Sequence, residues 1–185
     1  MGTVTAPPWG RPITRDDLDA TPDDGHRYEL IDGTLLVSPA PSIRHQIAVT
    51  QLLRLLQDAC PPELRALVAP VDVALSDRSV FQPDLLIARR GDFTDRDLPS
   101  APVLAVEVLT PGSRSIDQVL KHARYAEAGI GHYWIVDPSE PSLTAYLLSP
   151  EGTYDLVGHV AGLDAYRTAA PVNVTIVPGN LVTDD

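Results

Sequence analysis

Short apolar runs, bounded by Pro, Gly and charged residues, alternate along this chain with longer segments of helical periodicity. The runs at 80–89 and 103–109 are rich in Val, Leu and Ile, which is typical of buried strands. The second run is apolar on both faces apart from Glu107, the pattern of a central strand covered on both sides. Pro83 has no N–H to donate to a sheet, so we expect the first strand to begin or kink at Asp84.

Paired strand patterns around tight turns predict a β-hairpin near each end of the chain. The strong two-residue turn signal Asp32-Gly33 lies between strand patterns at 27–31 and 34–38. A second hairpin is expected from the patterns at 143–148 and 154–159. Further strand regions are predicted at 64–75, 132–137 and 170–177.

Two helices are predicted between these strands, and a short third one is expected to begin after Thr14. Ser42 can cap the first long helix, which extends to about Ala59 and has its apolar positions on one face. The second spans about 115–128 and is closed by Gly129.

The polar stripe of the helix at 115–128 allows two interpretations. Its apolar positions form one face at 100° per residue: Ile116, Val119, Leu120, Ala123 and Ala126. Asp117, Lys121 and Tyr125 follow one another at i, i+4 and i+8 on roughly the opposite side. Periodicity alone therefore favours a solvated stripe with one i,i+4 ion pair, which is worth about 0.3 kcal/mol.

The order of these elements predicts one domain of the α/β (or α+β) class, with a mixed β-sheet flanked by helices and β-hairpins at both ends. We place this domain at 13–180, which is within the usual size of a single domain. Residues 1–12 are expected to form a flexible lead-in, and 181–185 a polar tail.

Composition and charge limit the cellular compartment and the kinds of partner that we expect for this chain. No apolar run approaches the roughly 20 residues that a membrane span needs, and no secretory signal is visible, so no membrane partner is expected. The single cysteine, Cys60, fits a reducing cytoplasm. A net charge of −11 argues against a broad electropositive surface for nucleic acid. It leaves room for a small basic patch or for a bound divalent cation.

Asp84 and Glu107 are carboxylates in segments that otherwise have the composition of core strands. An ionised carboxylate in an apolar interior costs several kcal/mol unless it is paired or binds a metal, so the two suggest a metal site. Oxygen ligands of this kind suit Mg²⁺ or Mn²⁺, which can lower the pKa of a bound water and polarise a phosphate. Lys121, the only lysine among 14 basic residues, could supply a nearby ammonium.

Glu29 and His45 are weaker candidates when only their local pattern is considered. Glu29 lies in the first arm of the N-terminal hairpin, where a glutamate is usually a solvated strand residue. His45 lies in the first turn of a helix, where a histidine is more often a surface or capping residue than a ligand.

The motifs of the chain, in order, resemble those of the Uma2 family (formerly DUF820) of the PD-(D/E)xK nuclease superfamily. They are R-Y-E-L-I-D-G at 27–33, S-x-x-H at 42–45, Q-P-D-L-L-I-A at 82–88, L-A-V-E-V-L-T-P-G-S-R-S-x-D-x-x-x-K-x-x-x-Y at 104–125 and A-G-I-G-H-Y-W-I-V-D-P at 128–138. The resemblance implies a restriction-endonuclease-like core and a Mg²⁺-dependent endonuclease with DNA as its substrate.

The resemblance also assigns roles to individual residues. Asp84 matches the Asp of the P-D motif, and Glu107 matches the acid of the (D/E)xK motif. The superfamily lysine two residues further on is replaced here by Leu109, and Lys121 matches the position to which Uma2-like proteins move it. The helix stripe is then expected to face the site, with Tyr125 in support.

Glu29 and His45 also fall at positions where the family tends to keep these residue types. Glu29 would be a third acidic ligand beside Asp84 and Glu107, and His45 a phosphate or water contact.

Two other interpretations remain open. The net charge and Leu109 are compatible with a nuclease-like scaffold that binds DNA or a protein partner without cutting. Asp84 and Glu107 could also be structural acids, paired for example with Arg89 or Arg114. Because cutting two strands is most simply done by two copies of a site, a homodimer is a further expectation, with the hairpin after residue 137 as its interface.

Overall fold

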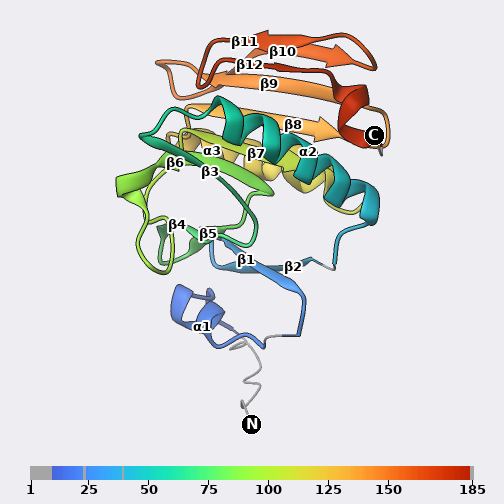
Figure 1. The fold of residues 1–185 in the computed structure, drawn as a ribbon. Coiled ribbons are helices and arrows are strands. Elements are labelled where there is room, and N and C mark those ends of the chain that lie inside the picture. Colours follow the sequence, from blue (N-terminus) through green and yellow to red (C-terminus); the bar gives the residue numbers. More distant parts are fainter. Residues whose placement is uncertain (1–9, 23, 39, 184–185) are drawn as a thin grey trace.

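The computed structural model describes residues 10–22, 24–38 and 40–183, and its centre is a six-stranded mixed sheet (Figure 1). Strands β7 and β8 run parallel, and the other neighbours in this sheet are antiparallel. In the order in which neighbours pair, the strands are β10 (Tyr154–Ala161), β9 (Ser142–Leu148), β8 (His132–Asp137), β7 (Leu104–Val108), β6 (Leu85–Arg89) and β3 (Leu64–Val68).

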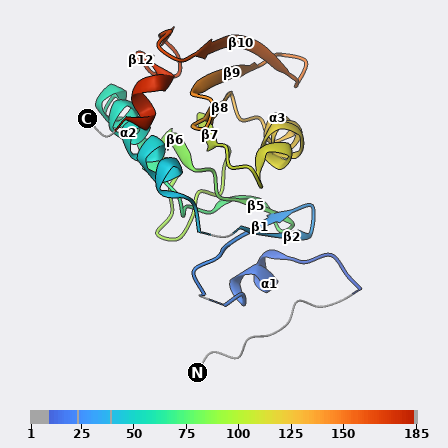
Figure 2. The same ribbon diagram turned by 90° about the vertical axis from the view of Figure 1, so that its right-hand side faces the viewer.

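A second, four-stranded antiparallel sheet lies between the six-stranded sheet and the short helix α1 (Arg15–Asp19) (Figures 1 and 2). Its strands, in pairing order, are β2 (Thr34–Ser38), β1 (Arg27–Ile31), β5 (Ser79–Phe81) and β4 (Val73–Ser76). The predicted N-terminal hairpin is confirmed by the pairing of β1 with β2. Asp32 and Gly33 make its turn with positive φ angles of 51° and 79°, which glycine and aspartate tolerate better than most residues.

Helices cover the two faces of the six-stranded sheet (Figure 2). The helix α2 (Ile43–Ala59) lies on one face and begins at the predicted cap, where the Ser42 hydroxyl accepts a hydrogen bond from the backbone N–H of His45. The π-helix η2 (Ile116–Lys121) and the α-helix α3 (His122–Glu127) lie on the other face. The predicted mixed sheet flanked by helices, with hairpins at both ends, is therefore confirmed.

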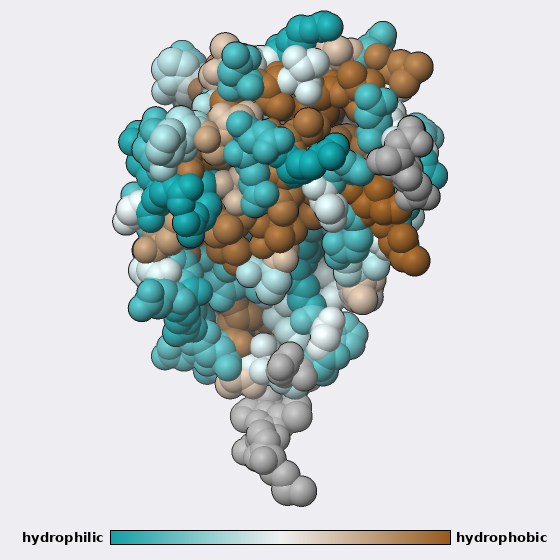
Figure 3. Space-filling view, viewed as in Figure 1, coloured by the Kyte–Doolittle hydropathy of each residue, from teal (hydrophilic) through white to brown (hydrophobic). Residues whose placement is uncertain are grey.

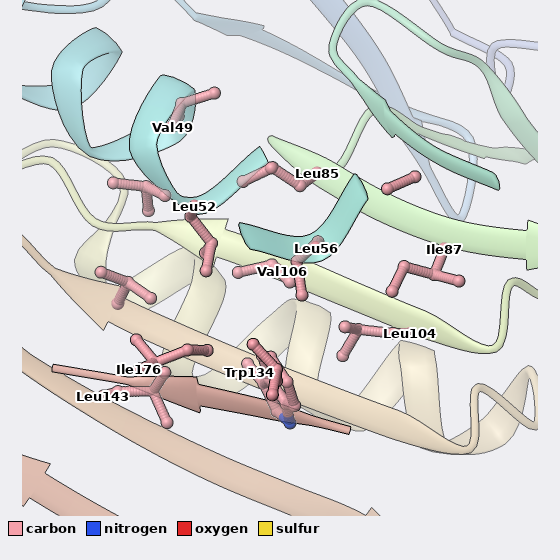
Figure 4. Packing of buried hydrophobic residues seen from close by; sticks show 14 of the residues in the cluster. Val49, Leu52, Leu56, Leu85, Ile87, Leu104, Val106, Trp134, Leu143 and Ile176 are labelled. Atoms are coloured by element: carbon pink, nitrogen blue, oxygen red, sulfur yellow. The ribbon is translucent and has the colours of Figure 1, made fainter. Parts of the chain in front are cut away.

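The alternation of side chains along β7 determines which face of the sheet carries the acid. Leu104, Val106 and Val108 pack with α2 in the main hydrophobic core (Figure 4). The residues between them face the other way, so Ala105 and Glu107 point toward η2 and α3. Glu107 is thus a carboxylate in the layer between the sheet and η2–α3.

The C-terminal part adds a small two-stranded sheet of β11 (Tyr166–Thr168) and β12 (Val174–Ile176), and two short 3₁₀-helices, η1 (Arg90–Asp92) and η3 (Pro178–Val182), complete the fold. The strand expected at 170–177 is shorter than predicted, and its partner β11 was not predicted. Leu181, at the start of the predicted polar tail, is buried in the main core, and Val182 packs against that core. Of the predicted lead-in, residues 1–9 lie outside the described ranges.

Two predicted strands are each divided between the two sheets. The region 64–75 forms β3 in the large sheet and β4 in the small one, and the region 80–89 forms β5 in the small sheet and β6 in the large one. Proline explains the second division, because Pro83 cannot continue a hydrogen-bonded ladder. The chain therefore leaves the small sheet at Phe81 and enters the large one at Leu85, with Asp84 at the crossing point.

The orientation predicted for the helix at 115–128 from its periodicity is wrong. Val119 is 69% exposed and Leu120 is 38% exposed, whereas Asp117, Lys121 and Tyr125 are buried. Residues 116–121 form a π-helix, whose wider turn invalidates a count at 100° per residue. The stripe faces the interior, as the family resemblance implies, because its polar groups find partners there.

The face of the molecule in Figure 3 combines hydrophilic areas with apolar patches across its middle. Several large apolar side chains are exposed among the described residues, including Ile43, Val119, Leu156 and Leu163. None of the helices in the described ranges has both the length and the apolar character needed to cross a membrane.

Leu52→Ala should lower the free energy of unfolding by about 2–5 kcal/mol, because Leu52 is fully buried between α2 and the sheet and its truncation leaves a cavity. Leu156→Ala is the matched control, since Leu156 is 62% exposed, and should change stability by less than about 0.5 kcal/mol. Urea unfolding followed by circular dichroism measures both. Equal effects would contradict the packing described for α2.

Candidate active site

A cleft of about 1020 Å³ opens between the N-terminal hairpin, the first turn of α2 and the loop after β7. Six of its lining residues carry charged or titratable side chains that interact at its floor: Arg27, Glu29, His45, Asp84, Asp117 and Lys121. A smaller pocket of about 430 Å³ borders the N-terminal half of α2 and is lined by no charged side chain. Of these two pockets, only the larger cleft is therefore lined by charged side chains.

Asp84 lies at the crossing point between the two sheets, and each of its oxygens has a partner. Its Oδ1 accepts a hydrogen bond from Arg27 Nη1 at 2.6 Å. Its Oδ2 accepts one from the backbone N–H of Val108 at 2.8 Å and lies 3.2 Å from His45 Nε2. Burial by itself would raise the pKa of Asp84, but the His45 hydrogen bond and the charge of Arg27 outweigh burial and hold it at about 2. Asp84 is thus ionised at neutral pH.

Glu107, from the centre of β7, is the most deeply enclosed acid of the site. Its Oε1 accepts hydrogen bonds from Lys121 Nζ at 3.0 Å and from the Tyr125 hydroxyl at 2.7 Å. Its Oε2 is buried and has no hydrogen-bond partner among the described residues. Burial raises the pKa of Glu107 well above its ordinary value, Lys121 counteracts this, and the charge of Asp117 raises it further.

Lys121 holds one ammonium among three carboxylates. Its Nζ lies 2.9 Å from Glu29 Oε1, 3.0 Å from Glu107 Oε1 and 3.6 Å from Asp117 Oδ1. Burial lowers the pKa of Lys121, but the charges of these acids more than compensate and raise it above its ordinary value. Lys121 is therefore a permanent cation that can stabilise negative charge, and it is not suited to act as a base at neutral pH.

Glu29 faces inward from β1 and is fully buried, contrary to the solvated position that its local pattern favoured. Besides Lys121, it accepts a hydrogen bond from the backbone N–H of Gln82 at 2.9 Å. Glu29 therefore connects the small sheet to both Lys121 and the segment that carries Asp84.

The side chain of His45 is buried beside Asp84, while its backbone keeps the capping role that its position favours. Its backbone N–H is part of the helix cap at Ser42, and its ring reaches Asp84. Its Nδ1 is buried without a hydrogen-bond partner among the described residues.

All six predicted site residues therefore meet at or directly behind the floor of the cleft: Glu29, His45, Asp84, Glu107, Lys121 and Tyr125. Arg27 and Asp117 are additional members that the sequence analysis did not identify as site residues. The motif R-Y-E places Arg27 two residues before Glu29, on the same side of β1, which is a signal that could have found it. Asp117 belongs to the helix stripe itself.

In the structure, Asp84 and Glu107 pair with cations other than those expected for a purely structural role. Arg114 pairs with Asp137, at 2.5 Å, rather than with Asp84 or Glu107. The cations that do pair with the two acids are Arg27 and Lys121.

The charge and donor types of this site fit a divalent cation. Four buried carboxylates (Glu29, Asp84, Glu107 and Asp117) face two cations (Arg27 and Lys121), which leaves a formal charge of −2 when His45 is counted as neutral. The unpartnered oxygen of Glu107 is one unused ligand atom. In the described part of the chain, however, no group of three or more His, Cys, Asp or Glu side chains is arranged so that it could hold a metal ion.

The sequence profile of the family Uma2, described as "Putative restriction endonuclease", matches residues 15–174. The chain belongs to the Uma2 family. A crystal structure described as a "putative nuclease belonging to DUF820", from Anabaena variabilis, has a similar fold, with a TM-score of 0.75 and 17% sequence identity over 92% of this chain and 98% of the other. No curated protein sequence matches the chain significantly. This Uma2 chain thus has the fold that its motifs imply.

Glu107→Gln should become more stable relative to wild type as the pH rises. In wild type the folded-state pKa of Glu107 lies above the unfolded value of 4.5, so wild type loses stability between 4.5 and the raised pKa, by about 1.4 kcal/mol per pKa unit. Glutamine does not ionise, so the variant lacks this loss. Urea unfolding of both proteins at about pH 5 and about pH 8 measures the difference. A difference that does not change with pH would contradict the raised pKa.

Proposed function

We propose that this Uma2 protein is a metal-dependent endonuclease that hydrolyses phosphodiester bonds of DNA. The proposal is carried by the excess of buried carboxylates over cations at the floor of an open cleft, and the family assignment supports it. Asp84, Glu107 and Glu29 would hold the cation, with Mg²⁺ or Mn²⁺ as the ions that suit oxygen ligands. When bound, such an ion polarises a phosphate and makes a bound water more acidic.

The residues of the chain would contribute positioning and charge. The ammonium of Lys121 stays protonated and would stabilise the negative charge that develops on the phosphate during hydrolysis. It pairs with Glu29 and, from η2, with Glu107. Leu109, at the usual position of the superfamily lysine, is buried in the apolar cluster beside Tyr125. Lys121 would therefore take the place of that lysine.

Tyr125 and His45 would orient the two principal ligands. The Tyr125 hydroxyl donates to Glu107, and its pKa is raised by burial and by Glu107, so it remains a donor at neutral pH. His45 would fix Asp84 through Oδ2, which leaves Oδ1 as the oxygen that faces Arg27. A homodimer, which would offer one site to each DNA strand, remains part of the proposal.

A second candidate is a nuclease-like scaffold that binds DNA or a protein partner without cutting it. The observation that favours it is the pairing of Asp84 and Glu107 with protein cations, together with the net charge of −11. It predicts that neither Mg²⁺ nor Mn²⁺ supports cleavage of any single- or double-stranded substrate.

Asp84→Asn should abolish Mn²⁺ binding and reduce DNA cleavage by about 10³-fold, because it removes the ligand charge without changing the shape of the side chain. Asp97→Asn is the matched control: Asp97 is also buried and ion-paired, with Arg15, but it lies outside the cleft. Calorimetric titration with Mn²⁺ and a cleavage assay on single- and double-stranded DNA give the two readouts. Full cleavage by Asp84→Asn in a clean preparation would reject the assignment.

A further inference from the structure

Arg27 has a more exposed side chain than the acids with which it pairs. Its side chain is 24% exposed in the cleft, while those of Asp84 and Glu29 are 5% and 1% exposed. It begins β1, at the free end of the hairpin, and covers Asp84 from the cleft side. Lys121, in contrast, is only 1% exposed and is enclosed by three acids. Arg27 is thus the cation of the site that can move into the cleft without crossing the core.

The contacts of Asp84 show which of its two carboxylate oxygens loses its partner when Arg27 moves away. Oδ2 is engaged by the Val108 N–H and the His45 ring, which can remain in place whatever binds the other oxygen. Oδ1 accepts from Arg27 alone among the described residues. A divalent cation and a guanidinium repel one another, so a cation at this oxygen weakens its contact with Arg27. Binding of a cation at Oδ1 therefore favours departure of Arg27 from it.

A guanidinium that is released into the cleft can form an ion pair with a phosphodiester group. The planar fork of arginine matches two oxygens of a phosphate and keeps its charge at every physiological pH. The floor of the cleft otherwise carries excess negative charge, which repels a phosphate until a divalent cation is present.

We propose that Arg27 exchanges partners: it neutralises Asp84 in the metal-free protein and binds a substrate phosphate once a divalent cation has taken Oδ1 of Asp84. This inference rests on the proposed function and adds a consequence to it. Cation and DNA then bind cooperatively, and by linkage each raises the affinity for the other by the same factor. Arg27 is both a competitor of the cation and a contact of the substrate.

The test is a set of four calorimetric Mn²⁺ titrations, on wild type and on Arg27→Gln, each with and without a short DNA duplex containing phosphorothioate linkages that slow hydrolysis. In wild type the duplex should tighten Mn²⁺ binding about 5- to 20-fold. Arg27→Gln without DNA should bind Mn²⁺ about 5- to 20-fold more tightly than wild type, because the competing cation is gone. In this variant the duplex should tighten Mn²⁺ binding by a smaller factor than in wild type, because only the direct attraction between cation and phosphate remains.

Arg44→Gln is the matched control. Arg44 lines the same cleft from the first turn of α2, is exposed, and lies outside the acid cluster. Its loss removes the same charge at a greater distance from Asp84, so Mn²⁺ affinity without DNA should change less than about twofold. Equal tightening in both variants would mean that general charge, and not exchange at Asp84, controls the cation, and would overturn the inference.

The outcomes separate this inference from the proposed function. Mn²⁺ binding that is lost in Asp84→Asn but is no tighter in Arg27→Gln overturns the role of Arg27 and leaves the nuclease proposal intact. Wild type that binds no Mn²⁺ with or without DNA overturns both. If Arg27→Gln does not fold, as judged by thermal unfolding, wild type alone decides, because an Mn²⁺ affinity that the duplex does not change contradicts the exchange.

Discussion

The ammonium of Lys121 connects three parts of the fold that are distant in sequence. Its three carboxylate neighbours come from β1 of the small sheet, from β7 of the large sheet and from η2 itself. A lysine so completely buried would be costly without these partners. The relative placement of the two sheets and of η2 therefore depends on the same ion cluster that forms the floor of the cleft.

The π-helix η2 also has a direct contact with the large sheet. Tyr133, from the neighbouring strand β8, donates its hydroxyl to the backbone oxygen of Asp117 at 2.9 Å and so takes part in the hydrogen bonding of the π-turn. Such turns are less stable than a regular α-helix and are frequent at functional sites. Here the π-turn accompanies the burial of Asp117 and Lys121 together, while Val119 remains exposed.

The same arrangement gives the site its chemical character. Burial and, to a smaller extent, the charges of neighbouring carboxylates raise the pKa values of Glu107 and Asp117, so the ionised forms of these acids are under electrostatic strain. A proton or a divalent cation can relieve that strain. Because Asp84 keeps a low pKa beside Arg27, the acids of the cluster are not equivalent, and they would respond differently to a bound cation.

Local signals along the chain are sufficient to specify the hairpin at Asp32-Gly33, the helix capped by Ser42 and the central strand around Glu107. Asp84 and Glu107 stand out in the sequence because an acid within an apolar strand is costly to bury and therefore informative. The other four residues that meet at the cleft are identified by the family resemblance and not by their local patterns. Long-range contacts decide which sheet each half of 80–89 joins, since both halves have the same apolar character. Long-range contacts also decide which face of η2 is buried. The burial of apolar side chains would favour one face, but three carboxylates from β1, β7 and η2 stabilise the burial of the opposite, polar face. Arg27 joins the site for the same reason, because its partner Asp84 is 57 residues away in sequence.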